Sequence, residues 1–372
     1  MLWFCIGTAG ELIKIYPLLR LATDRQQPWF VLATGQSPVN FKNQWKDFKL
    51  PDERFGFLTR TSHDLHSSKA ALKWFLSANL QTPSSLKRTI AEVAGTVPSK
   101  DDHWLVHGDT LSTLLGSRYA RMLKVPLSHV EAGLRSEDLF NPFPEEINRR
   151  LVSRLAQTHF AQDDRAFQNL KTAKVKGNLV CTEGNTQLDT IRLVLNDFVA
   201  GDIPPLPYVI ANIHRFENLN SSSRWATMID VLTKTAHEKA PVYLVLHPPT
   251  QDKLKGDPKT SRRLTEAGVR LLPRQPFTQF IHLLSHADFA ISDGGSNQEE
   301  CFYLGKPCLL LRESTERIEG LDGPCLLTRF KTELIDRFLK DPSKFASPAI
   351  LHQRSPSKII LDCLSAQSAG VI

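Results

Sequence analysis

Three acidic side chains stand at positions where a chain of alternating strands and helices can bring them together. Asp109 follows an apolar run at residues 103–107, and Glu131 follows a second run at residues 126–130. Glu145 opens a helix-like stretch after a proline-containing loop. Because adjacent parallel strands end at one edge of a sheet, where ligands bind, we expect these carboxylates to converge on one crevice. Grouped carboxylates transfer protons, so the pattern predicts an acid–base site.

A second group of candidate residues opens a helix late in the chain. The sequence S-D-G-G-S-N-Q-E-E at residues 292–300 comes directly after an apolar, strand-like run. Gly294 and Gly295 allow a ligand to approach the backbone. The free N–H groups there and Ser296 are suited to a diphosphate, because a helix begins with unpaired donors and a positive dipole end. A plain N-capped helix with an acidic first turn is the alternative interpretation.

Other polar side chains extend this second candidate site. Glu299 or Glu300 can accept two hydrogen bonds from a ribose diol, and Arg317 offers a guanidinium that matches phosphate bidentately. His214 lies at the end of an apolar strand, as does His247. A structural or exposed role for each histidine stays open.

The first strand-to-helix turn offers a weaker phosphate signal. Residues 2–6 are apolar, Gly7 and Gly10 bracket the turn, and Lys14 lies one helical turn further on. Free N–H groups at such a turn bind phosphate, although a tight turn without a ligand explains the glycines equally. The turn lacks the spacing G-x-G-x-x-G, so the sequence predicts no nicotinamide or flavin cofactor.

The order of apolar runs predicts the architecture. Strand-like and helix-like stretches alternate from residue 2 to about 176, and the alternation restarts after Gly177. This βα rhythm indicates parallel sheets with right-handed crossovers. We expect an α/β protein with two Rossmann-like domains facing a cleft, at residues 1–178 and 179–354. A last helix within residues 355–372 is expected to return to the first domain.

Composition fits a globular protein of two domains. The chain has 372 residues, of which 41% are hydrophobic and 23% charged. No apolar run approaches the roughly 20 residues that span a bilayer, and the apolar start lacks a basic flank, so neither membrane insertion nor a signal peptide is expected. The six cysteines form no C-x-x-C pair, which favours a reducing, cytoplasmic setting without a zinc site.

The net charge of +7 is scattered along the chain. No aromatic-interleaved basic stripe or RNA-binding motif occurs, so we expect no nucleic-acid partner. A solvated surface explains the excess, and it also favours an anionic small molecule such as a sugar nucleotide.

The motifs taken together resemble the UDP-N-acetylglucosamine 2-epimerase family over about residues 7–323. The resemblance rests on G-T-x-x-E-L-I-K (7–14), V-H-G-D-T (106–110), H-V-E-A-G-L-R (129–135), P-F-P-E-E-I-N-R (142–149), E-G-N-T (183–186), H-R-F-E-N (214–218), G-G-S-N-Q-E-E-C (294–301) and T-E-R (315–317). The family has two Rossmann-like domains in the GT-B arrangement, with UDP in the cleft.

The resemblance implies roles for individual residues. Asp109, Glu131 and Glu145 correspond to the catalytic carboxylates, and His214 corresponds to the residue that meets the diphosphate and assists the departure of UDP. The substrate contacts implied by matching positions are Lys14, Arg135, Gln275, Phe280 beside the uracil, Gly294, Gly295, Ser296, Glu300 and Arg317.

The resemblance also implies an activity. Non-hydrolysing members interconvert UDP-GlcNAc and UDP-ManNAc for surface polysaccharides, without a cofactor or metal, and as homodimers. The family's first loop, typically G-T-R-P-E, reads G-T-A-G-E here, and D-S-G-G reads D-G-G-S at residues 293–296. These ligand-loop differences leave a related UDP-2-acetamido sugar open as the substrate.

Two other functions remain open from the sequence. A hydrolysing 2-epimerase shares these motifs and releases UDP and free ManNAc. A glycosyltransferase shares the GT-B architecture, since fold does not fix function. The set of Asp109, Glu131 and Glu145 favours epimerisation, because sugar transfer alone does not demand it.

Overall fold

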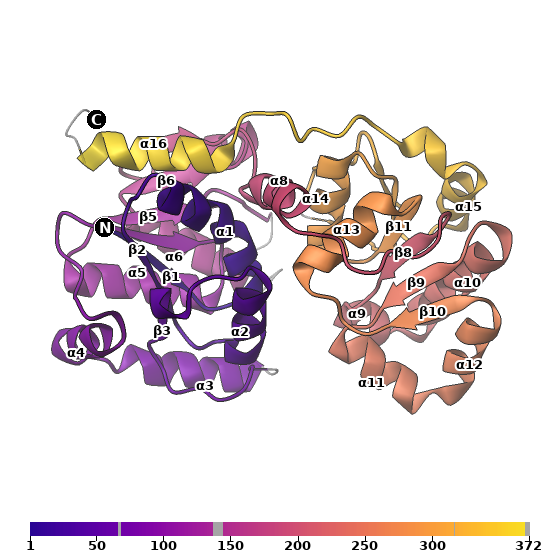
Figure 1. Cartoon of the computed structure of the whole chain (residues 1–372), viewed down its shortest axis with the longest axis horizontal. Coiled ribbons are helices and arrows are strands. Elements are labelled where there is room, and N and C mark those ends of the chain that lie inside the picture. Colours follow the sequence, from indigo (N-terminus) through magenta and orange to yellow (C-terminus); the bar gives the residue numbers. More distant parts are fainter. Residues whose placement is uncertain (66–67, 137–143, 316, 369–372) are drawn as a thin grey trace. The chain divides into compact units, whose positions relative to one another are not determined.

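A computed structural model of the chain describes residues 1–65, 68–136, 144–315 and 317–368. The chain forms two compact units, each with its own sheet (Figure 1). Unit 1 comprises Met1–Thr190 and Arg354–Ile372, and unit 2 comprises Ile191–Gln353. Both sheets are wholly parallel in their recorded strand pairs, which confirms the predicted α/β class.

Unit 1 contains a seven-stranded sheet in the order β3-β2-β1-β4-β5-β6-β7. Its strands are β1 (Leu2–Ile6), β2 (Trp29–Ala33), β3 (Phe55–Phe57), β4 (His103–His107), β5 (Leu127–Val130), β6 (Thr158–Ala161) and β7 (Asn178–Cys181). Its helices are α1 (Ala9–Asp24), α2 (Pro38–Asp47), α3 (Ser68–Asn79), α4 (Pro83–Ala94), α5 (Leu111–Leu123), α6 (Glu145–Leu155), α7 (Asp164–Thr172) and α16 (Pro356–Ser368). Helix α8 (Gln187–Asp197) begins in unit 1 and ends in unit 2.

The central strands of unit 1 are apolar and fully buried, as expected of parallel strands covered by helices on both faces. One face of the sheet packs Trp3 and Trp104 against Tyr119 of α5. The Tyr119 hydroxyl donates to the Ala78 carbonyl at 2.8 Å, which satisfies its polar atom inside this core and ties α5 to α3.

Helix α16 belongs to unit 1, although more than 150 residues of unit 2 precede it. It packs against α1. At its start, the Asp189 carboxylate accepts hydrogen bonds from the Ser355 hydroxyl at 2.8 Å and the Ser357 backbone N–H at 2.9 Å. This carboxylate satisfies free donors at the positive end of the helix. Residues 369–372 lie outside the described residues.

Unit 2 contains a six-stranded sheet in the order β10-β9-β8-β11-β12-β13. Its strands are β8 (Val209–Asn212), β9 (Val242–Val245), β10 (Val269–Leu272), β11 (Phe289–Ser292), β12 (Cys308–Leu310) and β13 (Cys325–Leu327). Its helices are α9 (Phe216–Leu219), α10 (Ser222–Glu238), α11 (Pro248–Gly256), α12 (Pro258–Glu266), α13 (Phe277–His286), α14 (Gly295–Leu304) and α15 (Thr332–Lys340).

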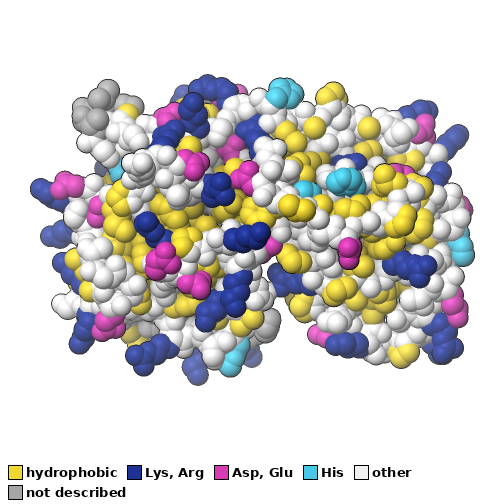
Figure 2. Space-filling model, in the orientation of Figure 1, with side chains coloured by type: hydrophobic (Ala, Val, Ile, Leu, Met, Phe, Trp, Pro, Cys, Tyr) yellow, Lys and Arg dark blue, Asp and Glu magenta, His cyan; other side chains and the backbone are white. Residues whose placement is uncertain are grey.

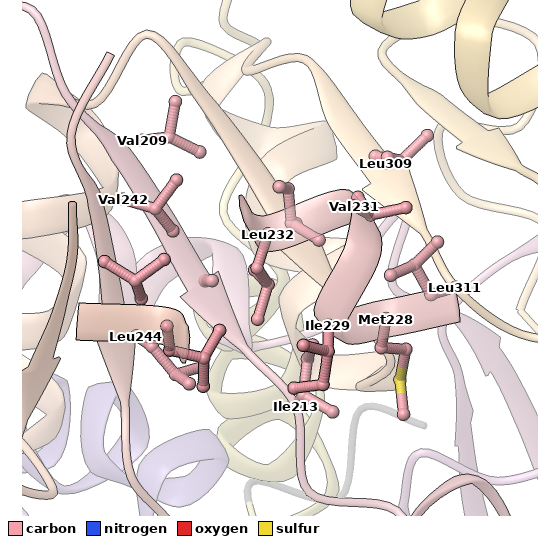
Figure 3. Packing of buried hydrophobic residues seen from close by; sticks show 14 of the residues in the cluster. Val209, Ile213, Met228, Ile229, Val231, Leu232, Val242, Leu244, Leu309 and Leu311 are labelled. Carbon is pink, nitrogen blue, oxygen red and sulfur yellow. The ribbon is translucent and has the colours of Figure 1, made fainter. Parts of the chain in front are cut away.

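Helix α10 covers one face of this second sheet. Figure 3 shows Met228, Ile229 and Leu232 of α10 directed toward strand residues such as Val209 and Leu244. These side chains are at most 2% exposed. Their spacing of one and then three residues places them on one face of a helix with 3.6 residues per turn. This apolar face forms the part of the core that α10 contributes.

Charged side chains of both signs are interspersed on the face drawn in Figure 2, where lysine and arginine do not form one continuous patch. Within the described residues, the helices include none with the length and apolar character needed to cross a bilayer.

His129 in β5 fixes the loop that carries Asp109. It is fully buried, and its Nε2–H donates to the Gly108 carbonyl at 2.7 Å. Burial, only partly offset by this hydrogen bond, lowers the pKa of His129 to about 3. The ring is therefore neutral at pH 7. Gly108 has a φ of +68°, a conformation that glycine adopts without strain. The hydrogen bond from His129 holds the turn between β4 and Asp109 in this conformation.

The buried neutral ring predicts acid lability. Its folded pKa lies below the unfolded value of roughly 6.5, so its contribution to stability is full above that value and is lost as pH falls toward the folded pKa of about 3. His129→Gln keeps a side-chain N–H donor and removes this titration. We expect its free energy of unfolding to fall less steeply below pH 6.5, by about 1.4 kcal/mol per pH unit.

Urea unfolding followed by tryptophan fluorescence measures this slope, because five of the six tryptophans lie in unit 1. The exposed His237→Gln serves as the control and should keep the wild-type slope. Equal slopes for wild type and His129→Gln would contradict the assignment of a buried neutral ring.

Candidate active site

Glu131 is the most constrained of the predicted site residues. It follows β5 with a φ of +62°, a left-handed conformation that costs energy for a residue with a side chain. Its carboxylate accepts from Lys14 Nζ at 2.7 Å and from Asn185 Nδ2 at 3.0 Å, both at Oε1. His107 Nε2 lies 3.3 Å from the other oxygen, Oε2. The strained backbone is thus held by side chains from α1, β4 and the loop after β7.

The Lys14–Glu131 ion pair is almost wholly removed from water, with side-chain exposures of 10% and 7%. Lys14 was expected at a UDP contact, and in the structure its ammonium is paired with the carboxylate. An unpaired charge at this depth would cost several kcal/mol. The pair therefore fixes the orientation of the Glu131 side chain, and Oε2 is the oxygen not used by Lys14 or Asn185 in these bonds.

Asp109 is held by an arginine that sequence reasoning had not singled out. Arg149 of α6 donates to Asp109 Oδ2 through Nε at 2.8 Å and approaches it through Nη2 at 2.6 Å. Burial acts to lower the pKa of Arg149, but the charges of Asp109, Glu131 and Glu146 outweigh it and raise that pKa. Arg149 therefore links the two predicted catalytic carboxylates electrostatically and stays charged.

The two adjacent acids at the start of α6 differ in their surroundings. Glu146 is fully buried and accepts from Arg150 Nε at 2.8 Å and from the Ser136 backbone N–H at 3.0 Å. Glu145 is only partly buried in the same helical turn. Arg135, expected at the substrate, lies 4.0 Å from Glu146 and donates to the Leu134 carbonyl at 2.7 Å. Glu146 and Arg135 thus brace the start of α6.

The turn at Gly7 is filled by the protein's own carboxylate. Glu11 Oε2 accepts from the backbone N–H groups of Gly7 and Thr8, each at 2.9 Å, and its Oε1 accepts from Thr110 at 2.8 Å. A side chain at position 7 would overlap Ser112 Oγ, which a built Cβ approaches to 2.0 Å. These contacts explain the turn without a phosphate, which was the alternative interpretation of its glycines.

Unit 2 places His214 beside the start of α14. The Asp293 carboxylate accepts from the backbone N–H groups of His214 at 2.9 Å and Arg215 at 3.0 Å, and from Asn218 Nδ2 at 3.1 Å. A Cβ built on Gly294 would lie 3.0 Å from His214 Cε1. The fully buried Asp293 thus fixes the His214 backbone against the glycine turn.

The start of α14 has the features expected of an anion site. Gly294 is its N-cap, and within the described residues no side chain caps it. Ser296 in the first turn is exposed, while Gly294, Gly295 and Asn297 around it are buried. Backbone N–H groups at an uncapped helix start favour phosphate oxygens.

Deeper in α14, two acids make internal pairs. Glu300 accepts from Asn297 Nδ2 at 2.8 Å. Glu299 accepts from Tyr303 at 2.8 Å and from Arg317 Nη1 at 2.5 Å. Arg317, expected at a phosphate, is therefore paired with a fully buried carboxylate. These bonds fix the loop around Arg317 to the helix.

Gln275, expected at the UDP-sugar, and Phe280, expected beside the uracil, lie between β10 and the end of α13. Gln275 is partly buried, and its Nε2 donates to the Pro273 carbonyl at 2.8 Å. Phe280, on α13, is only 8% exposed. Phe280 is therefore chiefly a core residue of unit 2, with a small accessible edge.

Comparisons with known proteins identify the family of the chain. The profile of a family described as UDP-N-acetylglucosamine 2-epimerase matches residues 23–339. A UDP-N-acetylglucosamine 2-epimerase of Escherichia coli O157:H7 is 30% identical over 93% of this chain and 92% of its own length. One of Yersinia pestis is 33% identical, and the match spans 60% of this chain and 62% of that protein.

A solved structure supports the same relationship. The UDP-GlcNAc 2-epimerase from Neisseria meningitidis, bound to UDP-GlcNAc, superposes with a TM-score of 0.73 at 25% identity, covering 98% of this chain and 99% of that one. Together with the family profile, which spans most of the sequence, this shows that the chain belongs to the UDP-N-acetylglucosamine 2-epimerase family.

Proposed function

We propose that this protein interconverts UDP-GlcNAc and UDP-ManNAc, or a closely related pair of UDP-2-acetamido sugars, without hydrolysis. The observation that carries the proposal is Glu131, a buried carboxylate on a strained backbone, held by Lys14, Asn185 and His107. Strain and buried charge of this kind gather at functional sites. Family membership supplies the substrate class.

The reaction proceeds by elimination and re-addition. A base removes the C2 proton, the C1–O bond breaks, and its electron pair leaves with UDP, which gives a 2-acetamidoglucal. A UDP oxygen then adds back at C1, and an acid delivers a proton to the opposite face of C2. Electrons balance within the substrate, so the proposal includes no redox cofactor and no metal. It requires proton-transfer groups on two faces of the sugar.

Unit 1 supplies those groups in this proposal. Glu131 and Asp109 are both held as carboxylates by cationic partners, Lys14 and Arg149. Glu145, which is partly buried, is the third candidate. Because clustered carboxylates titrate together, the set as a whole is assigned to acid–base catalysis.

Unit 2 supplies the nucleotide contacts in this proposal. Gly294 lets the diphosphate approach the backbone, while its own N–H donates to Ser292 Oγ at 2.9 Å. The Gly295 N–H, Ser296 and the His214 ring receive the diphosphate, whose charge grows as the C1–O bond breaks. Glu300 is assigned to the ribose, and Gln275 and Phe280 to the base. Arg317 and Arg135 act through the carboxylates with which they pair, Glu299 and Glu146.

We also propose a cytoplasmic homodimer that supplies precursors for surface polysaccharide. All six cysteines are free thiols, which supports a reducing compartment. Helix α3 exposes Leu72 and Leu76, one turn apart, and thereby offers apolar surface for self-association.

Proton NMR of the purified protein with UDP-GlcNAc in heavy water tests the activity. We expect UDP-ManNAc to appear and deuterium to enter C2 of both sugar nucleotides, because the C2 proton is exchanged during elimination. Accumulation of UDP and free ManNAc would show a hydrolysing enzyme. If C2 of UDP-GlcNAc keeps both its configuration and its proton when no acceptor is present, the result would favour a glycosyltransferase and overturn the proposal.

Substitution of the carboxylates tests their roles. Asp109→Asn, Glu131→Gln and Glu145→Gln should each lower kcat about 10²- to 10⁴-fold, since an amide cannot take up the proton. Affinity for UDP should stay near the wild-type value, because the nucleotide contacts are assigned to unit 2.

The matched control is Asp362→Asn, which removes an exposed carboxylate that pairs with Arg25. Thermal melts verify that each variant is folded. Wild-type turnover in any folded carboxylate variant would remove that residue from the catalytic set.

A further inference from the structure

Two imidazoles face each other at the carboxyl edge of the unit 2 sheet. His214 follows β8 and His247 follows β9, and these strands are neighbours with Asn212 in register with Val245. The rings stack with centroids 4.7 Å apart and an interplanar angle of 30°. The family motifs include His214, and they assign nothing to His247.

The charged groups around the pair come from three further elements. Asp293, after β11, lies with Oδ1 3.5 Å from His214 Nδ1. Arg215 and Glu217 flank the start of α9 and pair with each other at 3.1 Å. Arg274 follows β10 and acts on both rings.

Asp293 neutralises the pair poorly. Its carboxylate already accepts from two backbone N–H groups and from Asn218. His214 Nδ1 is buried and makes no hydrogen bond within the described residues. His247 is faced by the imidazole of His214 and the guanidinium of Arg274. Among the described residues, no carboxylate raises the pKa of His247.

These surroundings keep both rings uncharged in the free protein. Burial, followed by the nearby positive groups, lowers the pKa of His247 to about 3. Burial also lowers the pKa of His214, in spite of Asp293. Because the rings are 4.7 Å apart, a charge on one opposes a charge on the other. The pair can thus gain one proton readily only when an anion arrives.

We propose that His214 and His247 form one anion-binding pair, which takes up a proton when the diphosphate of a uridine nucleotide binds beside it. The inference rests on the proposed function, because it takes UDP as the ligand. It adds His247 as a further binding residue and gives the pair a role in catalysis. The proton acquired on binding offsets the charge that develops on the leaving diphosphate.

Isothermal titration calorimetry with UDP at pH 7, in PIPES and in Tris, tests the proposal. These buffers differ in ionisation enthalpy, so the difference in heat counts the protons exchanged. We expect net uptake of about half to one proton per UDP bound. The terminal phosphate of UDP can only release protons on binding to a cationic site, so net uptake must come from the protein.

His247→Gln should remove most of the uptake and weaken UDP binding at pH 6 more than at pH 8, because the linked proton strengthens binding as pH falls. The exposed His237→Gln is the matched control and should behave as wild type. Should His247→Gln fail to fold, the wild-type proton count alone decides the matter.

The outcomes separate the two proposals. UDP binding to wild type without net proton uptake, or with equal uptake in His247→Gln, overturns the proton-uptake inference and leaves the epimerase proposal standing. No UDP binding to wild type overturns the proposed function, and the pair's role with it.

Discussion

The buried ion pair between Lys14 and Glu131 is the interaction on which the arrangement of unit 1 depends. Glu131 has a backbone conformation that is unfavourable for its residue type, so its neighbours must hold it. Lys14 comes from α1, His107 from β4 and Asn185 from the loop after β7. These elements are a helix, a strand and a loop from three separate parts of unit 1. The sheet therefore brings one carboxylate three partners that are distant in sequence.

The two units use buried charge differently. In unit 1, the carboxylates proposed for proton transfer are paired with Lys14 and Arg149. In unit 2, the buried Asp293 is largely used by backbone N–H groups, and the neighbouring helix start carries no capping side chain within the described residues. One unit thus presents held negative charge and the other presents donors to an anion.

Much of the fold could be predicted from the sequence, because buried parallel strands are short apolar runs. Strands such as β4 and β5 stand out for this reason, and so did the positions of Asp109 and Glu131 after them. The strands β3 and β13 were missed. Each has only three residues and lies at an edge of its sheet, where burial imposes little pattern. Helix α2 was missed as well, because polar residues interrupt its apolar face.

The pairing of site residues was harder to predict, because it depends on contacts between distant segments. Arg149 lies beside Asp109 only because α6 packs next to the end of β4. Arg317 was expected at a phosphate, whereas its partner in the structure is Glu299. The role of Glu11, in contrast, is indicated by the residues next to it in the sequence. Thr8 and Glu11 form a capping box, a pattern that accounts for the first turn without a ligand.

A double-mutant cycle on kcat tests most directly whether Lys14 acts by holding Glu131. Lys14→Met and Glu131→Gln are assayed separately and together by NMR, with melts to verify folding. The ion pair predicts that the double variant loses no more activity than Glu131→Gln alone, because Lys14 has nothing left to position. Losses that multiply would show that the two residues act independently, and would contradict the central role given to this pair.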